Sequence, residues 1–154
     1  MGKMKRKLIT SFAALVTAGN VYVVPEVHAG QYTTDDFADD SESVLLARTI
    51  FGEARGCSDE DKLAVAYTVI NRARDGKIWN GEGNVREVIL KPWQYSCFNK
   101  KDPNRQKLSD PEKYDAGGFE KCLTIAEEVL CERHKDPTGG ATHYFNPAVV
   151  KPAW

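Results

Sequence analysis

Apolar residues recur at the spacing of an α-helix in three stretches of this chain, which cover residues 43–55, 58–76 and 110–133. A period close to 3.6 residues is typical of amphipathic helices. The second stretch opens on Ser58-Asp59-Glu60-Asp61, which resembles a capping box. The third opens on Asp110-Pro111, a cap residue followed by proline at the first helical position. The pattern therefore predicts a mainly α fold.

A shorter helix and a long irregular segment lie between the second and third stretches. Residues 84–90 read as a helix that is capped by Asn84 and bounded by Pro92. Residues 91–109 show neither helical nor strand periodicity, and irregular segments of this length are usually functional or disordered. Aromatic residues in this segment argue against disorder. We therefore expect a long irregular loop at a functional site.

Length and composition are those of one ordinary globular domain. The chain has 154 residues, of which 42% are hydrophobic and 28% charged. Its formal net charge is −1, and no block of basic residues runs through the body. Because nucleic-acid binding needs a basic footprint, we expect no nucleic-acid partner.

Residues 1–29 are predicted to be a secretory signal peptide. Lys3 and residues 5–7 carry positive charge, residues 8–24 carry none, and Val27-His28-Ala29 fits a cleavage site. A membrane anchor is the alternative, because about 17 uncharged residues approach a minimal span. Polar residues within the stretch weaken that alternative. We therefore expect an exported protein, periplasmic or extracellular, with no stable membrane span after signal cleavage.

The chain contains four cysteines, and all of them follow the predicted signal: Cys57, Cys97, Cys122 and Cys131. An even count in an exported domain predicts two disulfides. Cys122 and Cys131 lie about 13 Å apart along one predicted helix, beyond the roughly 7 Å that a disulfide allows. Two of the three connectivities remain open, and we favour Cys97–Cys122 with Cys57–Cys131. Residues 30–42 are polar and acidic and are expected to form a flexible lead-in.

Glu53 is the first candidate catalytic residue. It lies at the edge of the apolar stripe of the first predicted helix. A carboxyl against apolar surface has its charged form disfavoured, as a general acid requires. The alternative is a surface glutamate paired with an arginine. A glycosidase partner carboxylate could come from residues 59–61, but helix capping explains those acids already.

Other catalytic chemistries find little support in the sequence. Beyond the signal the chain has only His134 and His143, too few for a zinc site, so no metal and no cofactor are expected. The even cysteine count disfavours a Cys–His nucleophile. A Ser-His-Asp set remains open, although no Gly-x-Ser-x-Gly elbow occurs.

Several polar and aromatic residues are of the kind that line sugar grooves, because flat rings stack on pyranose faces while amides and hydroxyls bind ring substituents. These candidate substrate-binding residues are Gln94, Tyr95, Ser96, Tyr144 and Asn146, and Trp93 shares their character. The alternative is that the aromatic residues belong to the core. For Tyr95 and Tyr144 both interpretations stay open.

Taken together, residues 47–56, 64–72, 94–96, 136–138 and 140–147 resemble, in order, the motifs of the cell-wall hydrolase family typified by spore cortex-lytic enzymes. The resemblance covers nearly all of the chain after the predicted signal. It implies that residues 43–154 form a lysozyme-like, mostly helical catalytic domain that acts on the glycan strands of peptidoglycan.

The resemblance also implies a mechanism, that of a lytic transglycosylase. Glu53 lies where the family's catalytic glutamate lies. Such enzymes cleave between N-acetylmuramic acid and N-acetylglucosamine and leave 1,6-anhydro ends, so a single acid/base suffices. Cys57 departs from the family pattern, which often has an acid there. We expect a monomer.

Three other functions remain open from the sequence. The same site could activate water and hydrolyse the bond as a lysozyme does. A wall amidase or peptidase would need a metal or a free thiol. A non-enzymatic peptidoglycan-binding module could retain the fold without cleaving anything.

Overall fold

The computed structural model describes residues 12–17, 20–25, 30–77 and 83–144, and it divides into two units, residues 1–31 and 32–154. In the first unit, strand β1 (Phe12–Thr17) pairs antiparallel with β2 (Asn20–Pro25). This hairpin occupies the apolar part of the predicted signal peptide, whose cleavage site lies outside the described residues. Among the helices of the described ranges, none is both long and apolar enough to cross a membrane.

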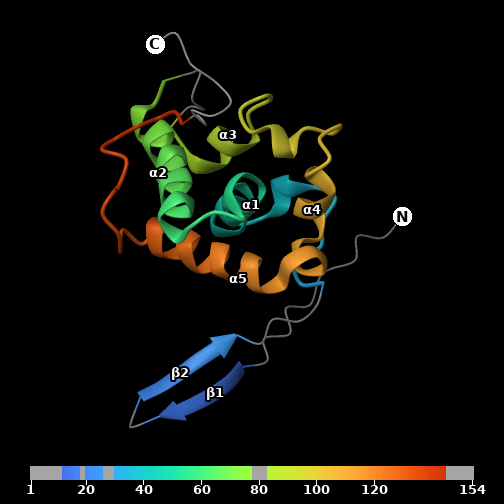
Figure 1. Ribbon diagram of the computed structural model, residues 1–154, viewed down its shortest axis with the longest axis vertical. Helices are drawn as coiled ribbons and strands as arrows, with labels where there is room; N and C mark the ends of the chain where they lie inside the picture. Colours follow the sequence, from blue (N-terminus) through green and yellow to red (C-terminus); the bar gives the residue numbers. More distant parts are fainter. Residues whose placement is uncertain (1–11, 18–19, 26–29, 78–82, 145–154) are drawn as a thin grey trace. The chain divides into compact units, whose positions relative to one another are not determined.

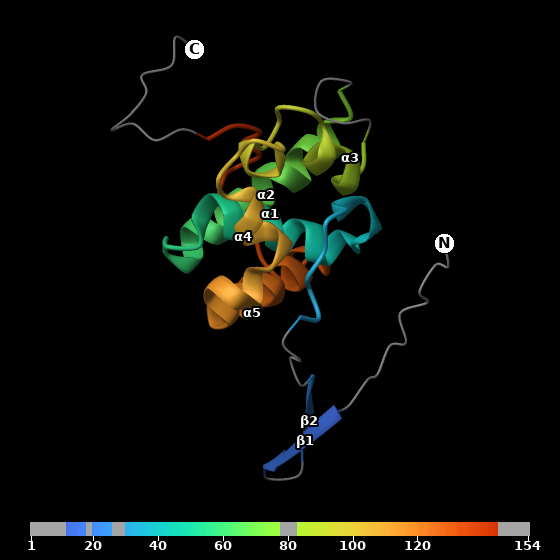
Figure 2. The ribbon, with the colours of Figure 1, turned by 90° about the vertical axis from the view of Figure 1, so that its right-hand side faces the viewer.

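The second unit is built around one central helix, which Figure 1 shows end-on. Seven consecutive residues of this helix, 45–51, are fully buried, so it is covered on all sides. Figure 2 shows α3 and α5 on opposite sides of α1. The mainly α prediction is confirmed for this unit. The helices are α1 (Glu42–Ala54), α2 (Asp59–Asp75), α3 (Val85–Leu90), α4 (Arg105–Ser109) and α5 (Pro111–Leu130).

The predicted helix ends are confirmed to within one residue, except that α5 ends at Leu130, three residues before its predicted end. Ser58 and Asp61 form the reciprocal capping box at the start of α2. Gly76 ends the same helix with a φ of 61°, a left-handed conformation that glycine adopts without a Cβ clash. Asn84 accepts a hydrogen bond from the backbone of Glu87 and caps α3. Local side-chain chemistry thus determines where these helices begin and end.

Helix α5 is kinked near its start, close to Gly117 and Gly118. Asp115 has non-helical backbone angles (φ −165°, ψ 83°) and its side chain accepts from the backbone N–H of Gly118 at 2.9 Å. A Cβ on residue 118 would collide with the Asp115 carboxylate. Asp115 therefore acts as an internal cap, and a larger residue at position 118 would have to displace its carboxylate.

The segment predicted to be irregular, residues 91–109, contains two short helices. Residues Ser96–Phe98 form a 3-10 helix, η3, and α4 is one turn long. Helices of three to five residues are too short to show a periodic pattern. The rest of the segment has no regular structure, as expected.

The flexible lead-in expected over residues 30–42 is instead a packed segment from Tyr32 onward. Phe37, in the 3-10 helix η1 (Phe37–Asp39), is buried and packs edge-on against Phe98, with ring centroids 5.1 Å apart. Ser41 caps α1. The acidic composition of the segment gave no sign of a buried aromatic residue, but Phe37 packs this segment against the core.

Arg48 explains why the segment is held so firmly. A charged residue in an amphipathic helix is expected on the polar side, but the structure buries Arg48 completely. Its Nε donates to Asp40 at 2.8 Å, and its other nitrogens donate to the carbonyls of Tyr32 and Leu108. One buried guanidinium therefore connects the N-terminal segment, α1 and α4.

Candidate active site

Glu53 lies in the last turn of α1 and is partly exposed. The hydroxyl of Tyr144 donates to its Oε2 at 2.9 Å, although the two residues are 91 positions apart. Desolvation and the nearby Glu53 carboxylate raise the pKa of Tyr144, so this hydroxyl keeps its proton and remains a donor. One carboxylate oxygen of Glu53 is thereby fixed by the protein.

The segment that carries Tyr144, residues 131–144, is here called the C-terminal strap, drawn in red in Figure 1. It runs back along α2 and is bound to that helix by side chains. Asn71 donates to Asp136, Thr138 and Ala141 at 2.9, 3.2 and 3.0 Å. Since the strap has no regular structure of its own, these bonds position Tyr144.

Arg72 links the strap to the irregular segment. Its Nε donates to the carbonyl of Thr142, and its Nη1 donates to the hydroxyl of Tyr95 at 2.9 Å. The guanidinium also lies 5.3 Å from the centroid of the Tyr95 ring. Burial raises the pKa of Tyr95 to about 12, and the charge of Glu53 acts in the same direction. Tyr95 is therefore a buried support of the site.

Cys97 lies beside Glu53 on the inner side of the site. It is almost fully buried, and burial together with the charge of Glu53 raises the pKa of its thiol. The Cys97 side chain lies directly over Gly52. A Cβ on residue 52 would be 2.8 Å from the Cys97 sulfur and 3.3 Å from a methyl of Leu108. Glycine before the glutamate thus permits the close approach of α1 and η3.

Replacing Gly52 with alanine is expected to displace Cys97, and with it the surroundings of Glu53. Overpacking of this kind costs roughly 1–3 kcal/mol of unfolding free energy. Any activity that depends on Glu53 should fall more steeply than stability, because the surroundings of Glu53 are disturbed. Chemical denaturation measures the loss of stability, and an assay of that activity measures the other effect.

Gly56 supplies the matched control for that substitution. A Cβ on residue 56 would meet nothing within 4 Å, and its φ is not positive. Gly56→Ala should therefore leave stability and activity unchanged. Equal behaviour of the two alanine variants would show that the contact between residues 52 and 97 has no bearing on the site.

Asp136 is the acid on which the strap depends. Its carboxylate accepts from the backbone of Thr138 and Gly140 and from the side chains of Thr138 and Asn71. Burial alone would raise its pKa, but these hydrogen bonds outweigh burial and lower the pKa to about 2. The charged form is therefore the form that holds the strap.

A pH dependence follows from this lowered pKa. The pKa of Asp136 in the folded protein, about 2, is below the usual 3.8. The ionised Asp136 therefore stabilises the strap fully above pH 3.8, and this stabilisation is lost as pH falls through 2. Hydrogen-exchange protection of the Thr138 and Gly140 amides should decrease over that range, while amides of α5 serve as the internal reference. Asp136→Asn should show weakened strap protection already at neutral pH. A strap that stays protected down to pH 2 would contradict this role.

The structure brings some of the predicted site residues together and separates others. Gln94 is partly exposed and Ser96 exposed, both beside Tyr95, whereas Asn146 lies outside the described residues. Tyr95 is buried, as the core interpretation expects, whereas Tyr144 is 43% exposed. Sequence reasoning missed Asn71 and Arg72 as supports. Both residues lie in the motif over residues 64–72, but that resemblance assigned no role to either.

All four cysteines are free thiols in the structure, so the predicted disulfides are not confirmed. Cys57 and Cys131 are exposed, while Cys97 and Cys122 are buried. The thiol of Cys97 lies near Glu53, whereas the charges that act on Cys122 are those of Lys62, Asp115, Asp59 and Lys121. The two buried thiols thus lie in different surroundings.

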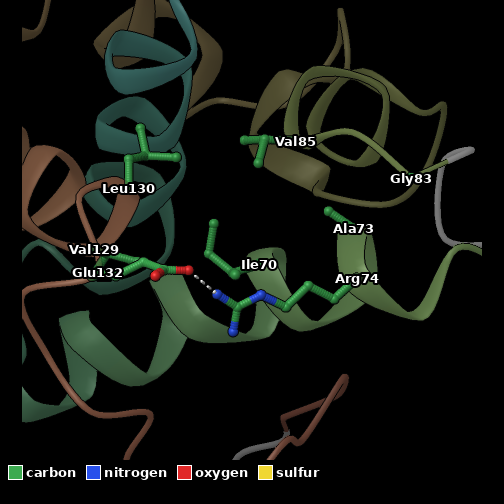
Figure 3. Close-up of a pocket in the computed structure, with 8 residues that line it drawn as sticks. All are labelled: Ile70, Ala73, Arg74, Gly83, Val85, Val129, Leu130 and Glu132. Atoms are coloured by element: carbon green, nitrogen blue, oxygen red, sulfur yellow. Dashed lines mark hydrogen bonds and ion pairs between the residues drawn. The ribbon is translucent and has the colours of Figure 1, made fainter.

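A pocket of about 230 Å³ lies between α2, α3 and the end of α5. Figure 3 shows the Arg74–Glu132 ion pair at its edge, with a nitrogen–oxygen distance of 3.0 Å. Its other lining residues are mostly apolar and include Ile70, Val85 and Val129. None of the residues that surround Glu53 lines this pocket. Across the described ranges, no group of three or more His, Cys, Asp or Glu residues could hold a metal ion.

Comparison with known proteins places the chain in a family. The spore cortex-lytic enzyme of Halalkalibacterium halodurans is 29% identical over 116 residues, which are 75% of this chain and 30% of that enzyme. The chain therefore spans about a third of that relative's length. No solved structure matches it significantly. The family model for cell wall hydrolases matches residues 56–154, and the chain thus belongs to the cell wall hydrolase family.

Proposed function

We propose that this protein is an exported lytic transglycosylase that cleaves the glycan strands of peptidoglycan, with Glu53 as its acid/base. The observation that carries the proposal is the partly exposed Glu53 carboxyl, one oxygen of which accepts a hydrogen bond from the Tyr144 hydroxyl at 2.9 Å. Membership of the cell wall hydrolase family supports a wall substrate. Glu53 lies just before the segment that the family model matches, so its role is proposed from the geometry and from the motif around it.

The proposed reaction needs a single carboxyl. Glu53 donates its proton to the oxygen between C1 of N-acetylmuramic acid and C4 of N-acetylglucosamine, and the C1–O bond breaks. The resulting carboxylate takes the proton of the muramic C6 hydroxyl as that oxygen bonds to C1. The product is a 1,6-anhydro ring, no water is consumed, and Glu53 regains its proton.

Tyr144 is proposed as a positioning residue in this reaction. It holds one oxygen of Glu53, which leaves the other oxygen for the substrate. Since the pKa of Tyr144 is raised, the hydroxyl stays a donor throughout the cycle. Gln94, Ser96 and Asn146 are proposed to contact the sugar, and a lysozyme-like arrangement of the domain is part of the same proposal. Tyr95 is proposed to support the site through its buried contact with Arg72.

A second candidate function is hydrolysis at the same site. Asp102 is a further carboxylate whose charge acts on the Cys97 thiol, as that of Glu53 does. An inverting or retaining glycosidase needs two carboxyls about 5–10 Å apart. Asp102 is the carboxylate to test as the base if water is the nucleophile.

Mass spectrometry of the soluble fragments released from purified peptidoglycan distinguishes these reactions. Transglycosylation gives muropeptides one water lighter than hydrolysis products. Full-mass reducing muropeptides would favour hydrolysis and make Asp102→Asn the next variant to assay. Released peptides with intact glycan would contradict both proposals, and binding without any release would favour a non-enzymatic wall-binding module.

A further inference from the structure

Trp93 occupies a backbone conformation that bulky residues rarely adopt. Its φ is 68°, within the left-handed region. The backbone N–H of Gln94 donates to the carbonyl of Lys91 at 3.1 Å, which closes a four-residue turn with Pro92 second and Trp93 third. This is the arrangement of a type II turn, whose third position favours glycine. The turn would form more easily with a smaller residue there.

The Trp93 side chain is also 85% exposed, the largest exposure among the large hydrophobic residues that are exposed in the described structure. An exposed indole gains little from the hydrophobic effect on folding. The backbone strain therefore opposes folding, and the exposed indole contributes no burial that would offset it. Strained residues persist where the surrounding structure holds them, and such positions cluster at ligand-binding sites.

The turn is connected to the surroundings of Glu53. Trp93 precedes Tyr95 by two residues, and the Tyr95 hydroxyl is held by Arg72 at 2.9 Å. Arg72 also binds the carbonyl of Thr142, two residues before the Tyr144 that contacts Glu53. Since Tyr95 is buried, it fixes the end of the turn and thereby limits where the indole can lie.

We propose that the indole of Trp93 is a stacking platform for a sugar ring of an extended N-acetylhexosamine strand. An indole has a broad apolar face, which matches the C–H face of a pyranose, and an N–H that can bind a ring substituent. The fixed turn presents that face without a loss of backbone freedom on binding. The proposal rests on the proposed wall substrate, and it concerns binding rather than the chemical step.

Trp93→Gly tests the platform because it separates binding from folding. Glycine relieves the positive φ, so the free energy of unfolding should stay the same or increase. Binding to purified peptidoglycan sacculi, measured by co-sedimentation in the Glu53→Gln background, should weaken at least about 10-fold. That is the loss expected for an aromatic side chain that becomes buried when the ligand binds. Trp93→Tyr keeps a ring and should retain most of the affinity.

Tyr114→Ala is the matched control, since Tyr114 is another exposed aromatic residue, on α5, and should leave sacculus binding unchanged. Unchanged binding of Trp93→Gly would overturn the proposal, and so would a loss of stability like that of a packed side chain. Because co-sedimentation measures binding rather than cleavage, this result is independent of the outcome of the Glu53 assay. Parallel binding measurements with chitin oligosaccharides show whether the platform needs the muramic acid sugar. If Trp93→Gly weakens binding to sacculi alone, the indole contacts muramic acid. If it weakens binding to both ligands, the indole is a general platform for N-acetylhexosamines.

Discussion

Glu53→Gln is expected to reduce the release of soluble muropeptides from peptidoglycan by at least about 100-fold, the usual contribution of a general acid/base. The amide cannot donate a proton to the glycosidic oxygen or accept one from the C6 hydroxyl. Its carbonyl oxygen can still accept the hydrogen bond of Tyr144, so the fold and the position of the side chain should be preserved. Mass-spectrometric quantification of products and thermal unfolding check the two halves of this expectation.

Glu120→Gln is the control for the same change of charge, because Glu120 is exposed on α5. It should retain full activity and an unaltered melting temperature. Substantial residual activity of Glu53→Gln would remove Glu53 from the chemical step. A parallel drop in melting temperature would instead assign it a structural role.

The helices of this protein could be predicted from sequence because their ends are determined locally. The capping box of Ser58 and Asp61 and the left-handed Gly76 involve residues a few positions apart. Arg48 could not be placed in the same way. Periodicity assigns a charged residue to solvent, and only the tertiary structure shows that Asp40, in a segment taken for a flexible lead-in, neutralises it.

The candidate site shows the same division between local and distant information. Glu53 and Tyr144 are candidate site residues because of their residue types and neighbouring sequence. Neither local sequence predicts the contact between them, which spans 91 residues. Cys97 was assigned to a disulfide on the basis of an even count, and the structure places its thiol beside Glu53 instead. Residue type pointed to the candidate residues, while their contacts depend on how α2 binds the strap.

Asp40→Ala is expected to have the largest effect on stability, a loss of about 3–5 kcal/mol of unfolding free energy. The substitution leaves the fully buried Arg48 guanidinium without its counter-charge, since the side chains of Arg48 and Asp40 are 0% and 14% exposed. Such a loss is a large fraction of the roughly 5–15 kcal/mol that stabilises a typical domain. Urea denaturation followed by circular dichroism measures it.

Lys121→Ala is the appropriate comparison, because Lys121 and Asp59 form an ion pair of the same 2.8 Å length in which both side chains are more than half exposed. Exposed pairs contribute at most about 1 kcal/mol, so burial rather than distance should separate the two variants. Arg48→Met combined with Asp40→Ala removes the unpaired charge and should recover part of the loss, but not all of it. The carbonyls of Tyr32 and Leu108 would still lack their donor. Equal stability of Asp40→Ala and Lys121→Ala would mean that the buried pair does not anchor the N-terminal segment to α1.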